Sequence, residues 1–385
     1  MAIDSNRIAA VREQVLTAFA GVELPSPEEL LQAGIPERDR EYAESFRGFI
    51  AGRTWDELGP GVFNYQQLFG CHFLSPTGFR YYIVPALLAG LTALECPQNL
   101  GGFDLLREEQ AKTRVRVRQF MERYGMPDVE KSAEEIWALL AHHVTWTISG
   151  RLAPSSWALY HDGLDPDFST RTSSLNSAQC GAVCAFLGLL FEWPHWRWKA
   201  AKALRRGWSH IRCPEVAMMA AFYQGMHHHT HSPPADAKER FPQAAPPELA
   251  EEIRSAFRGQ PYPPGKWLTR EGSGDEWCDC GLEFTGLNWE TLHPDFLEAH
   301  HESLIWFTDE AYHYFLPAYL LAESCGARLD GVAYSLQHLE RTAAFTPAQQ
   351  RAVFHYLQWQ KAADPGAADI AALVGQYSDR FRLNS

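Results

Sequence analysis

The stretch "YHYFLPAYLLAE" (residues 312–323) places Pro317 inside a run that otherwise favours an apolar helix. Residues 81–90 read "YYIVPALLAG" and repeat the arrangement around Pro85. A proline inside a helix removes a backbone hydrogen bond and bends the helix, at a cost of about 3 kcal/mol. The alanines and leucines that follow each proline favour helix over strand. We therefore predict two apolar helices, each bent at the proline inside it.

Four further pairs of phrases recur in the two halves of the chain, in the same order as the proline phrases. They are "VLTAFAG" (15–21) with "IRSAFRG" (253–259), "EY" (41–42) with "EW" (276–277), "GRTWDEL" (52–58) with "GLNWETL" (286–292), and "LNSAQCGAVCAFL" (175–187) with "FTPAQQRAVFHYL" (345–357). Each pair alone is a weak match, but five pairs in one order indicate an internal duplication.

The last pair of phrases carries the signals of a helix start. In "TPAQ" (346–349), Thr346 and Gln349 form the sequence pattern of a capping box, and Pro347 occupies the first helical position. "NSAQ" (176–179) repeats the pattern with Asn176 as the cap. The alternation typical of long strands is scarce throughout. We predict a mostly α fold with two related helical domains joined by a helical linker.

The spacing of the repeats sets the expected domain boundaries. The first copy is much longer between Pro85 and Gln179 than the second is between Pro317 and Gln349, which indicates an insertion in the first copy. The predicted organisation is a first repeat at 7–193 with a helical insert at about 97–165, linker helices at 194–247, and a second repeat at 248–385.

Composition and charge restrict the class of partner. The chain has 385 residues, of which 46% are hydrophobic and 13% aromatic, and this argues against a disordered protein. Its net charge of −13 disfavours nucleic acid and anionic membranes as partners. Two basic stretches, 112–123 and 196–206, are expected to be solvated helix faces. The partner expected from these features is another protein.

Cysteine usage and the pattern of apolar runs indicate the compartment. The eight cysteines are scattered through a long chain and do not resemble a disulfide framework. We find no signal-peptide pattern and no uncharged apolar run long enough to span a membrane. The expectation is a soluble protein of a reducing cytoplasm.

The repeated phrases resemble a small bacterial domain family whose activity has not been assigned. Its pattern is a short Ala-Phe helix, an acidic-aromatic pair, a lone Trp, a Tyr-Tyr-Leu-Pro-Ala helix and a Leu-Thr-Pro-x-Gln helix. The matching residues are Phe257, Glu276, Trp277, Trp289, Tyr314, Pro317, Ala318, Thr346, Pro347 and Gln349 in the second copy, and Phe19, Glu41, Tyr42, Trp55, Tyr82, Pro85, Ala86 and Gln179 in the first. The first copy departs by one extra residue before its proline and by the insert. The resemblance implies a duplicated helical domain and no particular activity.

One cluster in the second repeat has a spacing that could bind a metal. Glu298, His300, His301 and Glu302 fall within "EAHHE" (298–302). If 295–305 is a helix, Glu298 and His301 share one face in the Glu-x-x-His spacing of carboxylate-bridged metal sites. Such sites need a second similar motif, and the corresponding part of the first repeat lacks it. The alternative is a surface helix with a partly buried histidine.

Aromatic residues supply the candidates for a binding surface. Tryptophan and tyrosine are enriched among the residues that dominate protein interfaces. The candidates are Trp193, Trp196, Trp198, Tyr312 and Tyr314. Trp55 and Trp289 are expected to pack in the core instead.

The common catalytic and cofactor signatures are missing from the sequence, including the phosphate-binding loop, the dinucleotide fingerprint and the Gly-x-Ser-x-Gly turn. We therefore expect an interaction or regulatory protein without a cofactor, of the kind that neutralises or assists a basic effector. The alternative is a metal-assisted enzyme that uses the Glu/His cluster of the second repeat.

Overall fold

The structure is a computed structural model. It describes residues 4–55, 57–58, 73–95, 152–155, 159, 165–192, 197–228, 245–265, 267–270, 275–327, 329, 331–364 and 366–381. These residues contain fifteen α-helices, two short 3-10 helices and, in place of strands, two isolated β-bridges. The prediction of a mostly α fold is confirmed.

The chain divides into two compact units. The first comprises Met1–Ser155 with Leu164–Ala220, and the second comprises Ser156–Gly163 with Ala221–Ser385. Helix α10 (Arg197–Gly207) falls in the segment expected as a linker, but it packs against α9 (Ser177–Glu192) within the first unit. Most of the expected insert at 97–165 lies outside the described residues.

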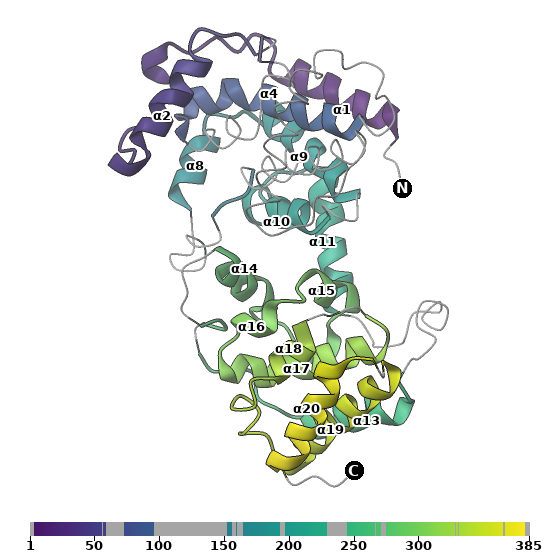
Figure 1. Cartoon of the computed structure of the whole chain (residues 1–385). Coiled ribbons are helices and arrows are strands. Elements are labelled where there is room, and N and C mark those ends of the chain that lie inside the picture. The colour runs from purple at the N-terminus through teal and green to yellow at the C-terminus, as the bar shows by residue number, and fades with distance from the viewer. Residues whose placement is uncertain are drawn as a thin grey trace. The chain divides into compact units, whose positions relative to one another are not determined.

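The first unit is organised around α1 (Ser5–Ala18), α4 (Pro76–Glu95) and α9, which pack against one another (Figure 1). Helix α1 buries Ile8, Val11 and Val15, whose spacing places them on one face of the helix. Helix α9 is apolar over most of its surface and is buried along most of its length, as its position in the centre of the unit requires. The unit's other elements are η1 (Pro27–Glu29), α2 (Glu37–Ile50) and α8 (Pro166–Thr172); α11 (Pro214–His227) begins here and ends in the second unit.

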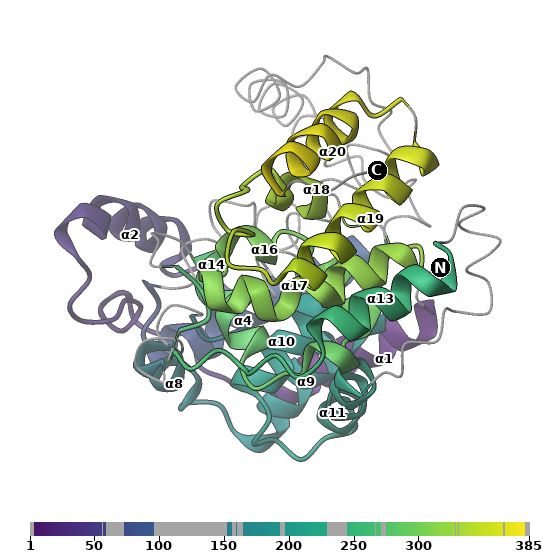
Figure 2. The ribbon, with the colours of Figure 1, turned by 90° about the horizontal axis from the view of Figure 1, so that it is seen from below.

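The second unit is organised around α13 (Pro247–Phe257), α17 (Asp309–Ser324) and α19 (Pro347–Ala363). Helix α13 packs against both α17 and α19, and α20 (Ala368–Phe381) covers α19 (Figures 1 and 2). Shorter elements complete the unit: α14 (Asp275–Phe284), η5 (Trp289–Thr291), α15 (Pro294–Ala299), α16 (Ser303–Trp306) and α18 (Gly331–Leu336).

An aromatic core holds the second unit together. The ring of Phe284, at the end of α14, lies 5.0 Å from each of the rings of Phe296, Phe307 and Phe315. All four residues are fully buried, and the pairs meet edge to face, which is the favoured arrangement of aromatic rings. The core thereby joins α14, α15 and α17 and fixes the turn between α16 and α17.

The helix signals in the sequence are found where they were expected. Pro85 lies inside α4 and Pro317 lies inside α17, and each helix continues past its proline. The capping box of Thr346 and Gln349 is formed, and α19 begins at Pro347. The two helices and the cap are confirmed, whereas the bend at each proline and the internal duplication stay predictions.

The membrane prediction concerns helix length and composition. None of the helices in the described ranges is long and apolar enough to cross a bilayer by itself. One bent pair, Pro166–Thr172 with Ser177–Glu192, reaches the required length and composition together.

Candidate functional site

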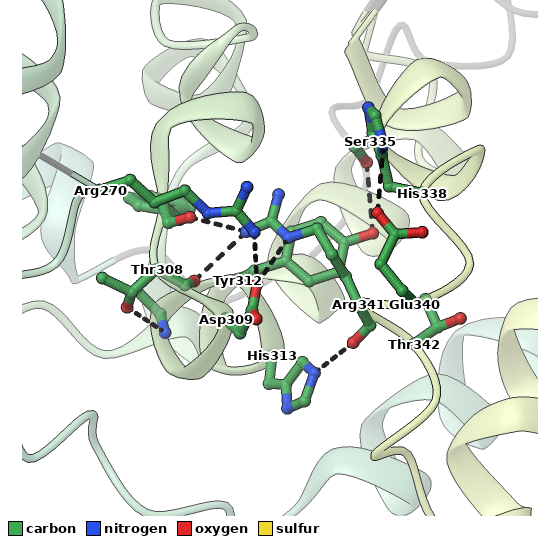
Figure 3. Close-up of polar contacts among 12 residues, drawn as sticks. Arg270, Thr308, Asp309, Tyr312, His313, Ser335, His338, Glu340, Arg341 and Thr342 are labelled. Atoms are coloured by element: carbon green, nitrogen blue, oxygen red, sulfur yellow. Dashed lines mark hydrogen bonds and ion pairs between the residues drawn. The ribbon is translucent and has the colours of Figure 1, made fainter. Parts of the chain in front are cut away.

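A cluster of polar side chains surrounds Arg341, in the segment between α18 and α19 (Figure 3). The side chain of Arg341 is 2% exposed. Its Nη1 donates to the backbone carbonyl of Leu304 at 2.7 Å, and its Nη2 donates to that of Phe307 at 2.7 Å. These carbonyls lie at the end of α16, where a helix leaves backbone acceptors without partners of its own. Arg341 therefore caps α16 from a distant part of the chain.

The remaining faces of the guanidinium are also occupied. Nε of Arg341 donates to Oδ1 of Asp309 at 3.1 Å, and the guanidinium carbon lies 3.9 Å from the ring centroid of Tyr312. A cation over an aromatic face is stabilised by the ring's negative quadrupole. Arg270 reaches the same carboxylate oxygen of Asp309 from the surface, at 2.5 Å (Figure 3). Asp309 thus joins a buried arginine to an exposed one.

The charges of the cluster shift its pKa values in ways that agree with this geometry. Partial burial acts to raise the pKa of Asp309, but the hydrogen bonds and positive charges of Arg270 and Arg341 outweigh it and lower that pKa. Burial lowers the pKa of Arg341, against the opposing effects of Tyr312 and Asp309. Burial raises the pKa of Tyr312 to about 12. Asp309 and Arg341 are therefore ionised at neutral pH, and the Tyr312 phenol is neutral.

Two further contacts attach the cluster to its surroundings. His313 donates from Nε2 to the backbone carbonyl of Arg341, and the hydroxyls of Tyr312 and Ser335 lie 3.4 Å apart. The first contact joins α17 to the segment between α18 and α19, and the second joins α17 to α18. Because its hydrogen-bonding groups point at protein atoms, the Arg341 cluster serves to position the helices. Arg270 and Asp309 are its exposed members, at 52% and 59% of their side chains.

The predicted metal residues are distributed over a break in the helix. The single helix expected over 295–305 is wrong: α15 ends at Ala299, His300 is its C-cap, and α16 begins at Ser303. The chain turns here because the His300 ring packs 4.6 Å from that of Phe296, and the His300 carbonyl accepts a hydrogen bond from the Tyr319 hydroxyl at 2.8 Å.

The four side chains consequently have different environments. His300 is buried at 8% exposure, whereas Glu298 and Glu302 are exposed. Nδ1 of His301 lies 3.1 Å from the backbone carbonyl of Glu298, and its Nε2 lies 3.8 Å from the Glu302 carboxylate. Within the described ranges, no group of three or more His, Cys, Asp or Glu side chains could hold a metal ion. The metal site stays a prediction.

Two of the five predicted binding aromatics are buried in the protein. Tyr312 is fully buried under Arg341 and Tyr314 is 7% exposed, so both rings belong to the core of the second unit. Trp198 is half-buried on α10, and Trp193 and Trp196 lie outside the described residues. Trp289 is buried, as expected.

Other aromatic side chains of the second unit reach the surface: Tyr262 is 38% exposed, Trp306 37% and Tyr334 49%. Tyr262 lies in "GQPYPPG" (259–265), and the prolines of that turn were a usable signal for a surface loop. Trp306 and Tyr334 lie on α16 and α18, which pack together. Nothing in their local sequence distinguishes them from core residues.

Arg341 was not predicted as a functional or structural residue, although the sequence contains a signal for it. "RTAAFT" (341–346) matches "RTSSLN" (171–176). Each segment ends at the residue that caps the following helix, Thr346 for α19 and Asn176 for α9. Arg171 is buried too, at 8% exposure, and its Nε donates to the backbone carbonyl of Asp167 at 3.3 Å. An arginine at the same place in two matching phrases was a detectable indication of a structural role.

No protein-family model, no curated protein and no solved structure matches the chain. The resemblance to a bacterial domain family therefore stays a prediction.

Proposed function

We propose that the chain is an interaction or regulatory protein of the cytoplasm, built by duplication of one helical unit. Helix α1 packs against α4 and α9 in the first unit, and α13 packs against α17 and α19 in the second. These helices carry the matching phrases in the same order. The common packing order supports the duplication.

The main support for a protein-interaction role is a pair of exposed aromatic side chains on the second unit. Trp306 and Tyr334 lie on helices that pack together, and each exposes more than a third of its surface. Large amphipathic side chains of this kind provide much of the affinity of protein interfaces. The net charge of −13 favours rapid encounter with a basic partner, such as an effector that this protein neutralises or assists.

The test is native mass spectrometry of the protein tagged in its own host and purified gently. The wild type should carry a second protein of defined mass, and Trp306→Ala with Tyr334→Ala should lose it. Tyr42→Ala is the matched control, because Tyr42 is an aromatic residue of similar exposure, 36%, on α2 of the first unit. The bare chain mass from the wild type would contradict the proposal, as would a complex that survives the double substitution.

The alternative proposal is a metal-assisted enzyme. It is favoured by one observation, the position of His301 between the Glu298 carbonyl and the Glu302 carboxylate. It predicts one metal ion per chain after purification without a chelator, and loss of that ion from a variant with His300→Ala and His301→Ala. A metal content below stoichiometry in the wild type would contradict it.

A further inference from the structure

A pair of cysteines lies where α9 meets the start of α11, within the first unit. Cys184 is fully buried on α9, and Cys213 is partly exposed at the residue before α11, which begins at Pro214. Both are free thiols. The thiol of Cys184 donates a hydrogen bond to the sulfur of Cys213, so the two side chains are in contact. A small side-chain movement therefore brings the two sulfur atoms to the disulfide bond length of about 2.05 Å.

The chain can approach α9 closely at this point because α9 has a glycine there. Cγ of Glu215 lies 2.5 Å from the position that a Cβ of Gly188 would occupy, so a larger residue at position 188 would displace the Glu215 side chain. Gly188 follows Cys184 by four residues, which places both on one face of α9. The glycine thus lets the first turn of α11 lie against the face of α9 that carries Cys184.

Three groups make hydrogen bonds with the sulfur of Cys213. It accepts from the backbone N–H of Val216 and from the thiol of Cys184, and its own S–H donates to the Glu215 carboxylate. The N–H of Val216 belongs to the first turn of α11, where backbone donors lack helical partners. These two donors stabilise a thiolate at Cys213, and the Glu215 carboxylate is in position to accept the proton as the thiolate forms.

The environments of the two thiols give them different roles. Burial raises the pKa of both, so both are protonated at neutral pH and each must lose its proton in order to react. Cys213 is partly exposed and has a carboxylate beside it, so an oxidant can reach it and its proton has an acceptor. Cys184 is 0% exposed and meets an oxidised sulfur only at Cys213. Cys213 is therefore the thiol that reacts first, and Cys184 is the thiol that completes the disulfide.

Packing does not account for a cysteine at position 184. In the matching phrases, Phe354 stands at the place of Cys184, and it is buried as well. An ordinary apolar side chain thus fills the corresponding place in the second unit. The thiol pair is a feature of the first unit alone.

We propose that Cys184 and Cys213 form a reversible disulfide when the protein meets a hydroperoxide. The Cys213 sulfur attacks the terminal peroxide oxygen and becomes a sulfenic acid, while the O–O bond breaks and the thiol proton passes through Glu215 to the departing oxygen. The Cys184 sulfur then attacks the Cys213 sulfur, the S–S bond forms, and the hydroxyl leaves with the Cys184 proton as water. The two sulfurs together lose two electrons, which reduce the peroxide. A dithiol reverses the reaction, as the reducing cytoplasm proposed for this protein also would.

The test is mass spectrometry of the full chain, which is first reduced, then freed of reductant and treated with hydrogen peroxide. The wild type should lose the mass of two hydrogen atoms, and a digest made without reductant should link the peptides that contain Cys184 and Cys213. Dithiothreitol should restore the original mass. A wild type without this linkage would overturn the proposal. The site shares no residue with the proposed protein interface, so the two proposals fail independently.

Matched variants assign the roles of the residues. Cys180→Ala removes the other thiol of α9, whose sulfur lies 4.0 Å from the Leu175 carbonyl, and it should form the linkage as the wild type does. Cys184→Ala should abolish the linkage and leave a sulfenic acid on Cys213 that dimedone traps. Glu215→Gln keeps the shape of the side chain without the proton acceptor, so it should slow the linkage at least about tenfold. A linkage that survives Cys184→Ala, or an unchanged rate in Glu215→Gln, would contradict the proposal.

Discussion

In the first unit, an isolated bridge joins Leu31 to Leu74 just before α4, and in the second unit a bridge joins Thr269 to Phe307 just before α17. A side-chain hydroxyl then caps the N-terminus of α4 and that of α17. Oγ of Ser75 accepts from the N–H of Gly78 at 3.0 Å, and Oγ1 of Thr308 accepts from that of Ala311 at 3.2 Å. The units thus use the same backbone arrangement at the same place.

The side chains around this common arrangement differ. Gln32 and Pro76 occupy the places that Arg270 and Asp309 have in the second unit. The ion pairs of Asp309 therefore belong to the second unit. The comparison teaches that the two units share their apolar packing and backbone pairing and differ in their polar groups.

The largest effect is expected from the buried arginines. Arg341→Ala should lower the free energy of unfolding of the second unit by about 3–5 kcal/mol, because it leaves two buried carbonyls without donors. Arg171→Ala should lower the free energy of unfolding of the first unit by several kcal/mol, as expected for an arginine that has the same structural role as Arg341. Urea unfolding monitored by circular dichroism measures both.

Arg270→Ala is the control for Arg341→Ala, because it removes an arginine from the same carboxylate at the surface. Its cost should stay below about 1 kcal/mol. Similar costs for Arg270→Ala and Arg341→Ala would contradict the structural role assigned to the buried guanidinium.

Glycines at matching turns should respond alike. Gly52 follows α2 with φ of 73°, and Gly286 follows α14 with φ of 77°. A Cβ would meet no atom within 4 Å at either position, so only backbone strain opposes alanine. Each Gly→Ala substitution should lower the midpoint of urea unfolding, at a cost of about 1–2 kcal/mol.

The control for the turn glycines is Gly48→Ala, inside α2, where alanine favours the helix by about 0.5–1 kcal/mol. It should raise the midpoint. A destabilising Gly48→Ala, or a neutral substitution at only one of the two turns, would show that the turns are not equivalent.

The helix caps should have smaller, paired effects. Asn176 and Thr346 each accept from the backbone N–H of the glutamine three residues on, at 3.0 Å and 3.3 Å. Replacing either by alanine should cost about 1 kcal/mol, the usual value of an N-cap. Thermal unfolding should show the loss in both variants, and a loss in only one would mean that the caps differ in strength.

The smallest effect concerns pH. Because the pKa of Asp309 is lowered from its ordinary 3.8, its ionised form stabilises the folded state at pH values above 3.8. That contribution disappears as the pH falls through the lowered pKa. The wild type should therefore exceed Asp309→Asn in stability at neutral pH, and the difference should shrink in acid. A difference in stability between wild type and Asp309→Asn that does not change with pH would contradict the ion pairs. Arg270→Ala should reduce the pH dependence of this difference.

The features of the fold that depend on residues close together in the chain could be predicted from the sequence. The apolar helices around Pro85 and Pro317 and the cap of α19 follow from short-range rules, and the structure has them. The metal spacing at 298–302 failed as a helix because the packing of His300 on Phe296, a tertiary contact, ended α15 early. Spacing along the chain cannot reveal such a contact.

The exposure of side chains was equally hard to predict. Tyr312 was expected at the surface, yet it lies beneath a guanidinium that comes from 29 residues further along the chain, and Trp306 was not considered although it is exposed. Both outcomes depend on which elements pack together.

The most direct test of the common plan of the two units is hydrogen exchange at the bridge amides. In the first unit, the N–H of Gln32 donates to the Phe73 carbonyl and the N–H of Ser75 donates to the Leu30 carbonyl, each at 2.9 Å. In the second unit, the N–H of Arg270 donates to the Trp306 carbonyl and the N–H of Thr308 donates to the Leu268 carbonyl, each at 2.8 Å. We predict that all four amides exchange slowly, with similar protection in the two units. Slow exchange in one unit and unprotected exchange at the matching amides of the other would contradict the account.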